Sequence, residues 1–431
     1  MQPDYSGITS SITYPIEQHR AGQHHPIDLW EAAQSLGLPA ALWRLPNQQD
    51  SHLIVSFDDI LPRVSVDLDE LPTGFLISPF DSKANRSNST ALDQSAQTLF
   101  LRADIQAIFF QDDQTTVKSV SGDMSDQFWR AVMARPSRQA KQSIAFKLTI
   151  LPDPDAQVQY IRNVKEAVEA MRQNTFRKVV LSRTKQIEFA DAPNAVELFE
   201  KLCQTYPTAF ISAVSIPERG QIWMSATPER LVSIDANGIF QTTSLAGTQS
   251  AFNPDGTAKR PPEAMWSQKE IEEQALVSRY IIECFKKIRL REYVEEGPKS
   301  IIAGNLMHLG TCFTVDTQAV RYPQLGTVMI RLLHPTSAVC GTPRDVAFDF
   351  INQHESHDRE LYSGFLGPVN VNTEEGSTTD IFVHIRCMKL EGKLATLYAG
   401  AGLTEDSNPE REWQETEMKC QTLLKVMMNG E

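Results

Sequence analysis

Hydrophobic and polar positions alternate in short runs along most of the chain, which predicts many β-strands. In the first half such runs cover residues 53–57 and 74–77, and in the second half 178–183, 210–214, 222–224, 230–234, 380–386 and 393–398. No unit of 20 to 50 residues repeats, so solenoids and propellers are excluded. Many strands with interspersed helices in one long chain predict an α+β fold built on large antiparallel sheets.

Helical spacing marks three segments. One passes through Val164, Val168 and Met171 and leads into the strand at residue 178. The second begins with the capping-box pattern at 267–270 and continues toward residue 290. The third begins with a similar pattern at 407–410, has proline in its first turn, and continues to about residue 427. The last two helices carry the acidic residues of greatest interest.

Two glutamates on these helices form a candidate metal site. Glu273 shares a stripe with Val277 and Cys284, so its carboxylate points toward a largely apolar face and needs a partner. Glu415 and Lys419 lie one turn apart on the last helix. Mg²⁺ commonly uses one or two carboxylates and completes its octahedron with substrate oxygens and water. We therefore predict Glu273 and Glu415 as Mg²⁺ ligands; the alternative for Glu415 is an exposed ion pair with Lys419.

Composition limits the possible partners. The chain has 431 residues, 41% hydrophobic and 22% charged, as expected for a globular enzyme. Its 54 acidic and 41 basic residues give a formal charge of -13, which argues against nucleic acid or an anionic membrane surface as the main partner. The six cysteines form no Cys-x-x-Cys pair, so we expect reduced thiols. Without an apolar leader or bilayer-length run, we expect a soluble, cytoplasmic protein.

Lys178 and Glu229 form a candidate acid-base pair. As a free amine Lys178 could take a proton from water, and a protonated Glu229 could give one to a leaving hydroxyl. A lysine near its reference pKa of ~10.4 is protonated at neutral pH, so this chemistry needs burial or a cationic neighbour such as Arg183 or Lys419. The alternative is a solvated strand lysine and a turn glutamate.

A glycine pair and an arginine complete the candidates from the residues themselves. Gly400 and Gly402 would let a ligand approach the backbone closely, although such a pair is more often a bulge or tight turn. Arg386 could clamp a carboxylate with its planar fork, and its alternative is a structural ion pair.

Taken together, these segments resemble the chorismate-utilising enzymes. The matching motifs, in the family's order, lie at residues 178–183, 227–229, 245–248, 269–273, 308–311, 333–341, 359–364, 385–387, 398–402 and 412–416. The resemblance is strong over residues 155–427, and residues 1–150 form the less distinctive N-terminal part of the same fold. It implies one two-lobed α+β fold with helices packed outside the sheets, and a Mg²⁺-dependent site in the cleft.

Three positions discriminate among the reactions of this family. Lys178 stands where members that add water carry lysine, whereas members that add ammonia usually carry a non-basic residue. Ala246 replaces the lysine with which aminodeoxychorismate synthases attack the ring. Ala338 stands where salicylate synthases tend to have threonine. The resemblance therefore implies conversion of chorismate to isochorismate, with a salicylate synthase and a non-catalytic chorismate-binding protein as alternatives.

The resemblance also implies roles for individual residues. Lys178 would deprotonate the water that attacks C2, Glu229 would protonate the departing C4 hydroxyl, and Mg²⁺ on Glu273 and Glu415 would orient the ring carboxylate. The implied substrate contacts are Ala246, Gly247, Thr248, His308, Ala338, Arg359, Tyr362, Ile385, Arg386, Gly400 and Lys419. We expect a monomer that binds chorismate and neither nucleic acid nor membranes.

Three residues depart from the family's pattern. Gln274 stands where histidine is usual, Ser244 replaces a frequent proline, and Gln249 replaces the usual arginine. Gln274 forms hydrogen bonds but does not titrate, and the other two changes predict looser substrate contacts. The sequence leaves open whether the product would feed menaquinone or siderophore synthesis.

Overall fold

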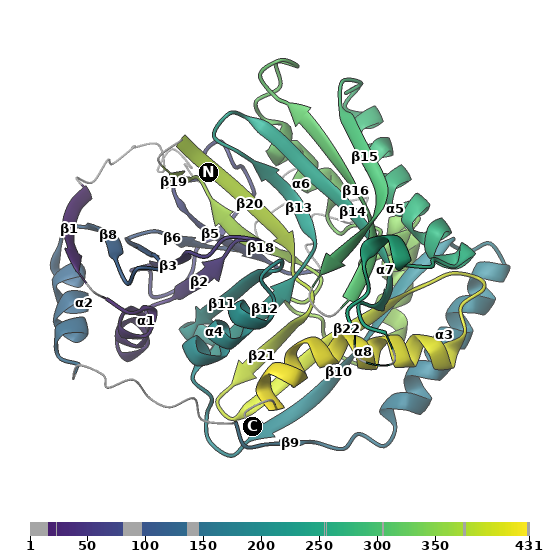
Figure 1. The fold of residues 1–431 in the computed structure, drawn as a ribbon, viewed down its shortest axis with the longest axis horizontal. Coiled ribbons are helices and arrows are strands. Elements are labelled where there is room, and N and C mark those ends of the chain that lie inside the picture. The colour runs from purple at the N-terminus through teal and green to yellow at the C-terminus, as the bar shows by residue number, and fades with distance from the viewer. Residues whose placement is uncertain are drawn as a thin grey trace, which may run out of the picture.

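The protein is described here from a computed structural model. The model describes residues 16–22, 24–80, 97–135, 146–253, 255, 257–303, 306–373 and 376–428. These residues form two large sheets, in which every strand pairing is antiparallel, and eight α-helices (Figure 1). The α+β fold with large antiparallel sheets that the hydrophobic pattern predicts is confirmed.

Sheet A has twelve strands among the described residues. Their order is β1 (Ile16–Gly22), β8 (Thr115–Val120), β7 (Ile105–Phe109), β3 (Ser51–Val55), β2 (Ala40–Arg44), β11 (Phe210–Ile216), β12 (Gln221–Thr227), β21 (Cys387–Glu391), β22 (Leu394–Leu403), β10 (Lys178–Phe189) and β17 (Gly341–Thr342), and β9 (Leu148–Ile150) pairs with β10.

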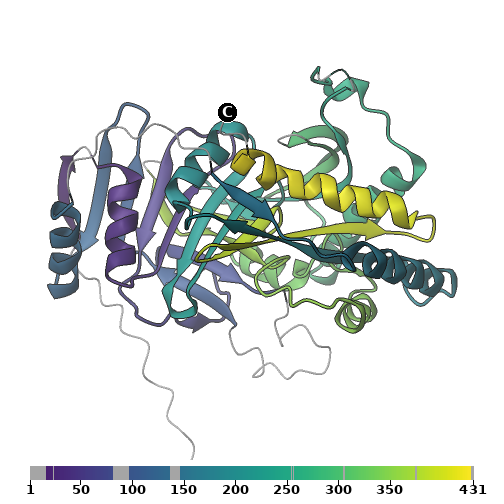
Figure 2. The same ribbon diagram turned by 90° about the horizontal axis from the view of Figure 1, so that it is seen from below.

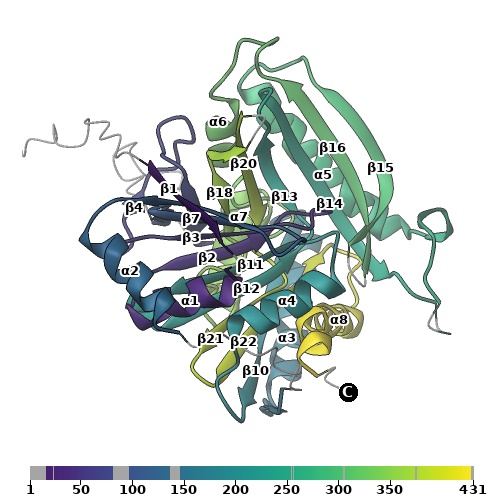
Figure 3. The same cartoon turned by 60° about the vertical axis from the view of Figure 1, so that its left-hand side comes forward.

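Sheet B has ten strands among the described residues. Their order is β15 (Val294–Ala303), β16 (Leu306–Asp316), β14 (Ile239–Ser250), β13 (Arg230–Ile234), β20 (Gly376–Val383), β18 (Phe365–Val369), β5 (Gly74–Ser78), β6 (Thr98–Arg102) and β4 (Arg63–Val64), and β19 (Val371–Thr373) pairs with β20. Figure 3 shows β14, β16 and β15 side by side at one end of this sheet.

The helices cover the outer faces of the sheets. They are α1 (Pro26–Ser35), α2 (Asp123–Met133), α3 (Ala156–Arg172), α4 (Ala195–Thr205), α5 (Gln268–Lys287), α6 (Leu325–Leu333), α7 (Arg344–His354) and α8 (Pro409–Met428). Helix α8 packs along β22 of sheet A, as Figure 2 shows, whereas α5 packs on β14 and β16 of sheet B. The two helices that carry the predicted metal ligands therefore belong to different lobes.

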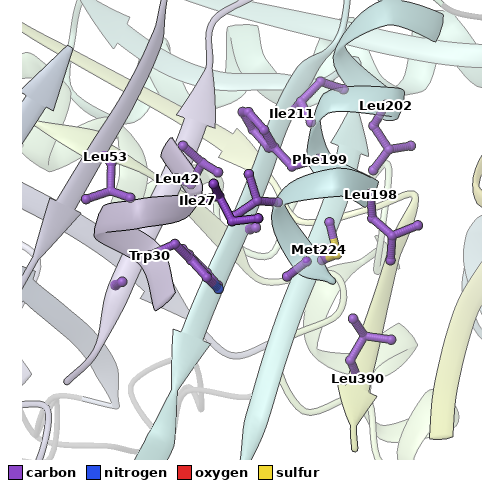
Figure 4. Close-up of a cluster of buried hydrophobic side chains, with 14 of the residues drawn as sticks. Ile27, Trp30, Leu42, Leu53, Leu198, Phe199, Leu202, Ile211, Met224 and Leu390 are labelled. Carbon is purple, nitrogen blue, oxygen red and sulfur yellow. The ribbon is translucent and has the colours of Figure 1, made fainter. Parts of the chain in front are cut away.

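Both faces of the middle of sheet A are buried, because the alternating side chains of strands such as β2 and β11 enter two different cores. On β2, Ala40 and Leu42 pack under the helices, while Ala41 and Trp43 point between the two sheets. Figure 4 shows part of the core under the helices, formed by Ile27, Trp30, Leu42, Leu53, Leu198, Phe199, Leu202, Ile211, Met224 and Leu390. Between the sheets, the rings of Phe210 and Phe382 stack with centroids 4.1 Å apart. These contacts join the two lobes into one body.

The first part of the chain contributes to both sheets. Strand β2 pairs with β11 in sheet A, and β5 pairs with β18 in sheet B. Both partner strands lie within residues 155–427. The N-terminal strands therefore form one end of each sheet, with β1 and β4 at the edges.

The helix caps and one strand end refine the sequence predictions. Ser267 caps α5 in a capping box with Glu270, as predicted. At α8 the cap is Asn408, whose side-chain oxygen accepts a hydrogen bond from the backbone N of Arg411 at 3.0 Å, while the Ser407 hydroxyl accepts one from Thr404. The run predicted as a strand over 380–386 pairs only to Val383, because Arg386 has a left-handed backbone with φ of 49°.

Candidate active site

A cavity lies where β10, β22 and α8 of one lobe meet β14, β16 and α5 of the other. Of the residues predicted from the sequence, it is lined by Glu229, Ala246, Gly247, Thr248, Glu273, His308, Ala338, Tyr362, Ile385, Arg386, Gly400, Gly402, Glu415 and Lys419. The sequence analysis did not single out six others that share the lining: Val180, Pro228, Leu245, Val339, Tyr398 and Ala399. Most of these are apolar and resemble ordinary core residues, but all six lie within the motifs that carry the family resemblance, which is the signal that could have found them.

Lys178 does not itself line the cavity; it contacts the lining residue Glu273 and is completely buried, with 0% of its side chain exposed. Its Nζ lies 3.0 Å from Glu273 Oε1. The alternative of a solvated strand lysine is therefore wrong, and the burial that base chemistry requires is present. Strand register explains the contact, since β10 places Val180 opposite Gly402 of β22. A Cβ added at Gly402 would overlap Glu273 Oε1 and lie 3.3 Å from Lys178 Cε. Gly402 thus makes room for this ion pair.

Glu229 and Glu273 line the same cavity and have opposite shifts in pKa. Burial raises the pKa of Glu229 to about 7, although Lys178, Arg386 and Lys419 act in the other direction. Burial also acts to raise the pKa of Glu273, but there the nearby lysines outweigh it and lower the pKa. Glu229 is therefore suited to give up a proton near neutral pH, and Glu273 to remain a carboxylate.

Glu415 lines the cavity from α8 and pairs with Lys419, whose Nζ lies 2.7 Å from Glu415 Oε1. The same Nζ donates a hydrogen bond to the carbonyl oxygen of Gly400 at 2.7 Å, which ties α8 to β22. The pair predicted on this helix therefore exists, but it faces the cavity and is largely buried rather than exposed. No group of three or more His, Cys, Asp or Glu side chains in the described part of the chain is arranged to hold a metal.

These carboxylates fit a cation that is completed by substrate and water. Glu273 and Glu415 line one cavity. They lie in the second turn of two different helices, α5 and α8. Such a two-carboxylate set is what Mg²⁺ uses, and it does not suit the closed cage of a structural metal. The residues present therefore fit the predicted ion.

His308 presents a hydrogen-bond acceptor to the cavity. Its Nδ1 lies 2.7 Å from the carbonyl oxygen of Gly247, which only accepts, so Nδ1 carries the hydrogen. Burial, followed by the charge of Arg386, lowers the pKa of His308 to about 3, so the ring is neutral. Its Nε2 is buried and has no partner among the described residues. The bulge between Ala246 and Gln249 places Gly247 there with φ of +69°, a conformation that favours glycine.

Arg386 is the buried cation of the cavity with a free donor. Its left-handed backbone turns it out of the strand ladder, and its Nη1 has no partner within the described ranges. Among the residues that the structure describes, Arg386 forms no ion pair, so its alternative as a structural ion pair is not supported. The Tyr362 hydroxyl lies against Gly400, so close that a Cβ added there would be 2.7 Å from it. Burial raises the pKa of Tyr362 to about 12, so the hydroxyl keeps its hydrogen and remains a donor.

Arg359, by contrast, does not reach the cavity. Its guanidinium pairs with Glu355 through Nε at 2.8 Å and Nη2 at 2.6 Å, and it donates to the carbonyl oxygens of Val339 and Val180. The predicted substrate contact is therefore corrected: Arg359 forms a structural ion pair. Because Val180 and Val339 both line the cavity, Arg359 holds two of its walls together.

Arg183 is also not a cationic neighbour of the predicted base. Its Nε donates to Thr416 Oγ1 at 2.7 Å, its Nη2 pairs with Glu417, and its guanidinium lies 3.9 Å from the ring centroid of Trp413. These contacts fasten α8 to β10. The cation that influences both Glu229 and Glu273 besides Lys178 is Lys419.

Two of the residues that depart from the family's pattern, Gln274 and Ser244, are hydrogen-bonded to each other. Gln274 is buried, and its Nε2 donates to Ser244 Oγ at 2.8 Å and to Thr311 Oγ1 at 3.2 Å. A proline at position 244 would lack that hydroxyl. Gln249 instead reaches the carbonyl oxygen of Met265. The Gln274–Ser244 bond thus fixes the strand that leads to Gly247.

The fold and this site define a chorismate-binding enzyme, and comparison with known proteins agrees. The family described as chorismate binding enzyme matches residues 83–428, so the chain belongs to this family.

Among characterised relatives, the isochorismate synthase DhbC of Bacillus subtilis (strain 168) is 28% identical over 305 residues, which span 69% of this chain and 75% of that protein. The isochorismate synthase EntC of Escherichia coli (strain K12) is 32% identical over 251 residues, which span 58% of this chain and 62% of EntC.

The solved structure of MenF, the menaquinone-specific isochorismate synthase of Escherichia coli, has a TM-score of 0.72 at 21% identity and covers 96% of this chain and 95% of its own. The solved structure described as a putative 2,3-dihydroxybenzoate-specific isochorismate synthase, DhbC from Bacillus anthracis, has a TM-score of 0.67 at 22% identity, covering 93% of this chain and 99% of its own. Both structures show the same fold.

No helix among the described residues is long and apolar enough to cross a membrane.

Proposed function

We propose that this enzyme is an isomerase that converts chorismate reversibly to isochorismate with Mg²⁺. The observation that carries the proposal is the division between the two carboxyl groups of one cavity: Glu229 has a pKa of about 7, and Glu273 is held ionised beside a buried lysine. An exchange of one hydroxyl for another needs an acid and a base together, whereas a protein that only binds chorismate needs neither. The relatives named as isochorismate synthases support this reading.

The proton transfers balance within these residues. Lys178 first releases the proton that makes it an ion-pair partner of Glu273. As the free amine it then takes a proton from the water whose oxygen forms the new bond to C2. The ring double bonds shift, the bond from C4 to its oxygen breaks, and Glu229 gives its proton to that oxygen, which leaves as water. After the reaction Lys178 has one proton more and Glu229 one proton fewer. The reverse reaction therefore uses the same two groups with their roles exchanged.

Substrate binding is assigned to the polar groups that line the cavity. His308 Nε2 accepts a hydrogen bond from a ring hydroxyl, because it is neutral and its Nδ1 is already used. Arg386 Nη1 and the Tyr362 hydroxyl serve a carboxylate of the substrate. Lys419 adds a positive charge beside Gly400. These cations create the local positive site that an acidic protein needs to bind a dianionic substrate.

Mg²⁺ belongs to the same proposal. Glu273 and Glu415 would hold the ion, which would supply positive charge for the ring carboxylate of chorismate. The protein's own contribution is to present both carboxylates at one cavity and to keep Glu273 ionised.

The test is to incubate the purified protein with chorismate, with and without Mg²⁺, and to separate the products by chromatography with mass detection. We expect isochorismate to form without pyruvate, and only in the presence of Mg²⁺. Starting from isochorismate, the same enzyme should form chorismate. If the products are salicylate and pyruvate, the enzyme is a salicylate synthase and the proposed function is wrong. Saturable binding of chorismate without any product would instead make the chain a non-catalytic binding protein.

A further inference from the structure

An ion pair that the proposed chemistry does not use joins the two lobes beside the cavity. Lys269 of α5 and Glu412 of α8 meet with Nζ 2.6 Å from Oε1. The Glu412 side chain is 3% exposed and that of Lys269 is 25% exposed, so the pair is largely shielded from water. We call this pair the inter-lobe bridge.

The bridge lies close to the predicted metal ligands in both helices. Lys269 precedes Glu273 by four residues on α5, and Glu412 precedes Glu415 by three on α8. Residues three and four apart share one face of a helix. The bridge therefore joins the same two helix faces, one turn before the carboxylates that would hold the ion.

Electrostatics place Lys269 near the predicted ligands independently of this spacing. Burial acts to lower the pKa of Lys269, but Glu412, Glu273 and Glu415 outweigh it and raise the pKa. Burial raises the pKa of Glu412, Lys269 opposes this, and Glu415 adds to it. One lysine thus lies within the field of three carboxylates from two lobes.

We infer that Lys269 and Glu412 are positioning residues that set the separation of Glu273 and Glu415, and so the affinity of the site for a divalent cation. The reason is mechanical. Helix α5 is anchored on sheet B and α8 on sheet A, so neither sheet by itself fixes the distance between the two helix ends. The bridge joins these ends directly. This inference rests on the proposed Mg²⁺ site.

The test needs a variant that leaves the net charge unchanged, because removing Lys269 alone would also take a positive charge away from the cation. The double variant Lys269→Met/Glu412→Gln removes one charge of each sign. We expect it to weaken Mn²⁺ binding, measured by electron paramagnetic resonance of the free ion and by calorimetry, by about tenfold or more, as for other residues that orient metal ligands. Lys269→Arg, which keeps the charge and the donor, should bind within about twofold of the wild type.

A control is available on the same helix. Lys185 pairs with Glu417 of α8 at the same 2.6 Å, and Arg183 pairs with the same carboxylate, but both basic residues are in β10, so these pairs lie within one lobe. The double variant Lys185→Met/Glu417→Gln should lower the melting temperature to a similar degree and leave Mn²⁺ affinity unchanged.

Three outcomes would overturn the inference. The first is wild-type affinity in Lys269→Met/Glu412→Gln, and the second is an equal loss of affinity in both double variants, which would indicate only general destabilisation. The third is a wild-type protein that binds no divalent cation, which removes the metal site itself. Chorismate turnover in the presence of a chelator then decides separately whether the proposed isomerase activity stands.

Discussion

At the scale of single residues, this cavity shows how burial produces opposite charge states in identical side chains. Glu229 is buried and Glu273 is largely buried, with 13% of its side chain exposed, but only Glu273 has a lysine Nζ at 3.0 Å. Desolvation disfavours the charged form of a carboxyl, and a cation in contact favours it. The balance of these two effects makes one group an acid and the other a carboxylate ligand.

Replacing Lys178 tests the assignment of the base. We expect Lys178→Ala to reduce kcat by about 10² to 10⁴-fold, the usual contribution of a general base, and to retain Mg²⁺-dependent chorismate binding. Steady-state kinetics and calorimetry with chorismate measure the two effects. Lys185→Ala on the same strand is the control, since that lysine pairs with Glu417. Unchanged turnover in Lys178→Ala would rule out the mechanism.

The acid predicts a pH profile. Because Glu229 must be protonated to protonate the leaving hydroxyl and has a pKa of about 7, kcat/KM should fall as the pH rises above about 7. In Glu229→Gln the residual activity should be low and should lack this decline. A decline that persists in the variant would assign it to another group.

The same group predicts how stability depends on pH. Its pKa is raised in the folded state, so the folded protein binds the proton more tightly than the unfolded chain, and stability falls as the pH rises from about 4.5 to about 7. Glu229→Gln is neutral throughout. The stability of the variant relative to the wild type should therefore increase by roughly 2 kcal/mol between pH 5 and pH 8. Urea unfolding at both pH values, without metal or substrate, measures it, and a constant difference would contradict the raised pKa.

At the scale of single elements, strand β22 decides whether the site can form. Gly402 has extended backbone within the strand, so its requirement for glycine is steric rather than conformational. It is the position at which a side chain would displace the carboxylate of α5.

Gly402→Ala should consequently raise the Mg²⁺ concentration for half-maximal activity by about tenfold, because the new methyl group pushes Glu273 away from its place. A Mg²⁺ titration of initial rates measures this. The second substitution Glu273→Asp shortens the side chain by one methylene and should recover part of the metal response in the Gly402→Ala background. An unaltered Mg²⁺ requirement in the single variant would show that Glu273 tolerates displacement.

At the scale of the whole molecule, the N-terminal strands are built into the catalytic lobes. Without them β11 and β18 would each lose a neighbour, and both would become exposed edges of buried sheets. The Phe210–Phe382 stack, which joins the sheets, lies in the same core as Trp43 and Phe75 from the first part of the chain.

A fragment of residues 146–431 should therefore be insoluble or unfolded by circular dichroism. Co-production with residues 1–145 should restore soluble protein, because the lost strands are supplied again. A fragment that folds alone and binds chorismate would show that the catalytic region is an independent domain.

The sequence by itself determined the local elements and the type of chemistry. Alternation located β13 at its observed bounds, the capping box located the start of α5, and helical spacing placed Glu273 on a buried face. These predictions succeed because period and capping depend on residues within one turn or one strand. The motif order was sufficient to identify the family, which the match over residues 83–428 confirms.

Only the tertiary structure decided which of several equivalent side chains enter the cavity. Arg359 and Arg386 both stand in matching motifs, but Glu355 and two carbonyl oxygens pair with the Arg359 guanidinium, whereas Nη1 of Arg386 has no partner in the described part of the chain. Arg183 faces α8 for a similar reason. The burial of Lys178 depends on β22 and α5, which lie far away in the sequence. Exposure, ion pairing and pKa are set by neighbours that the fold brings together, so residue type and spacing alone do not contain them.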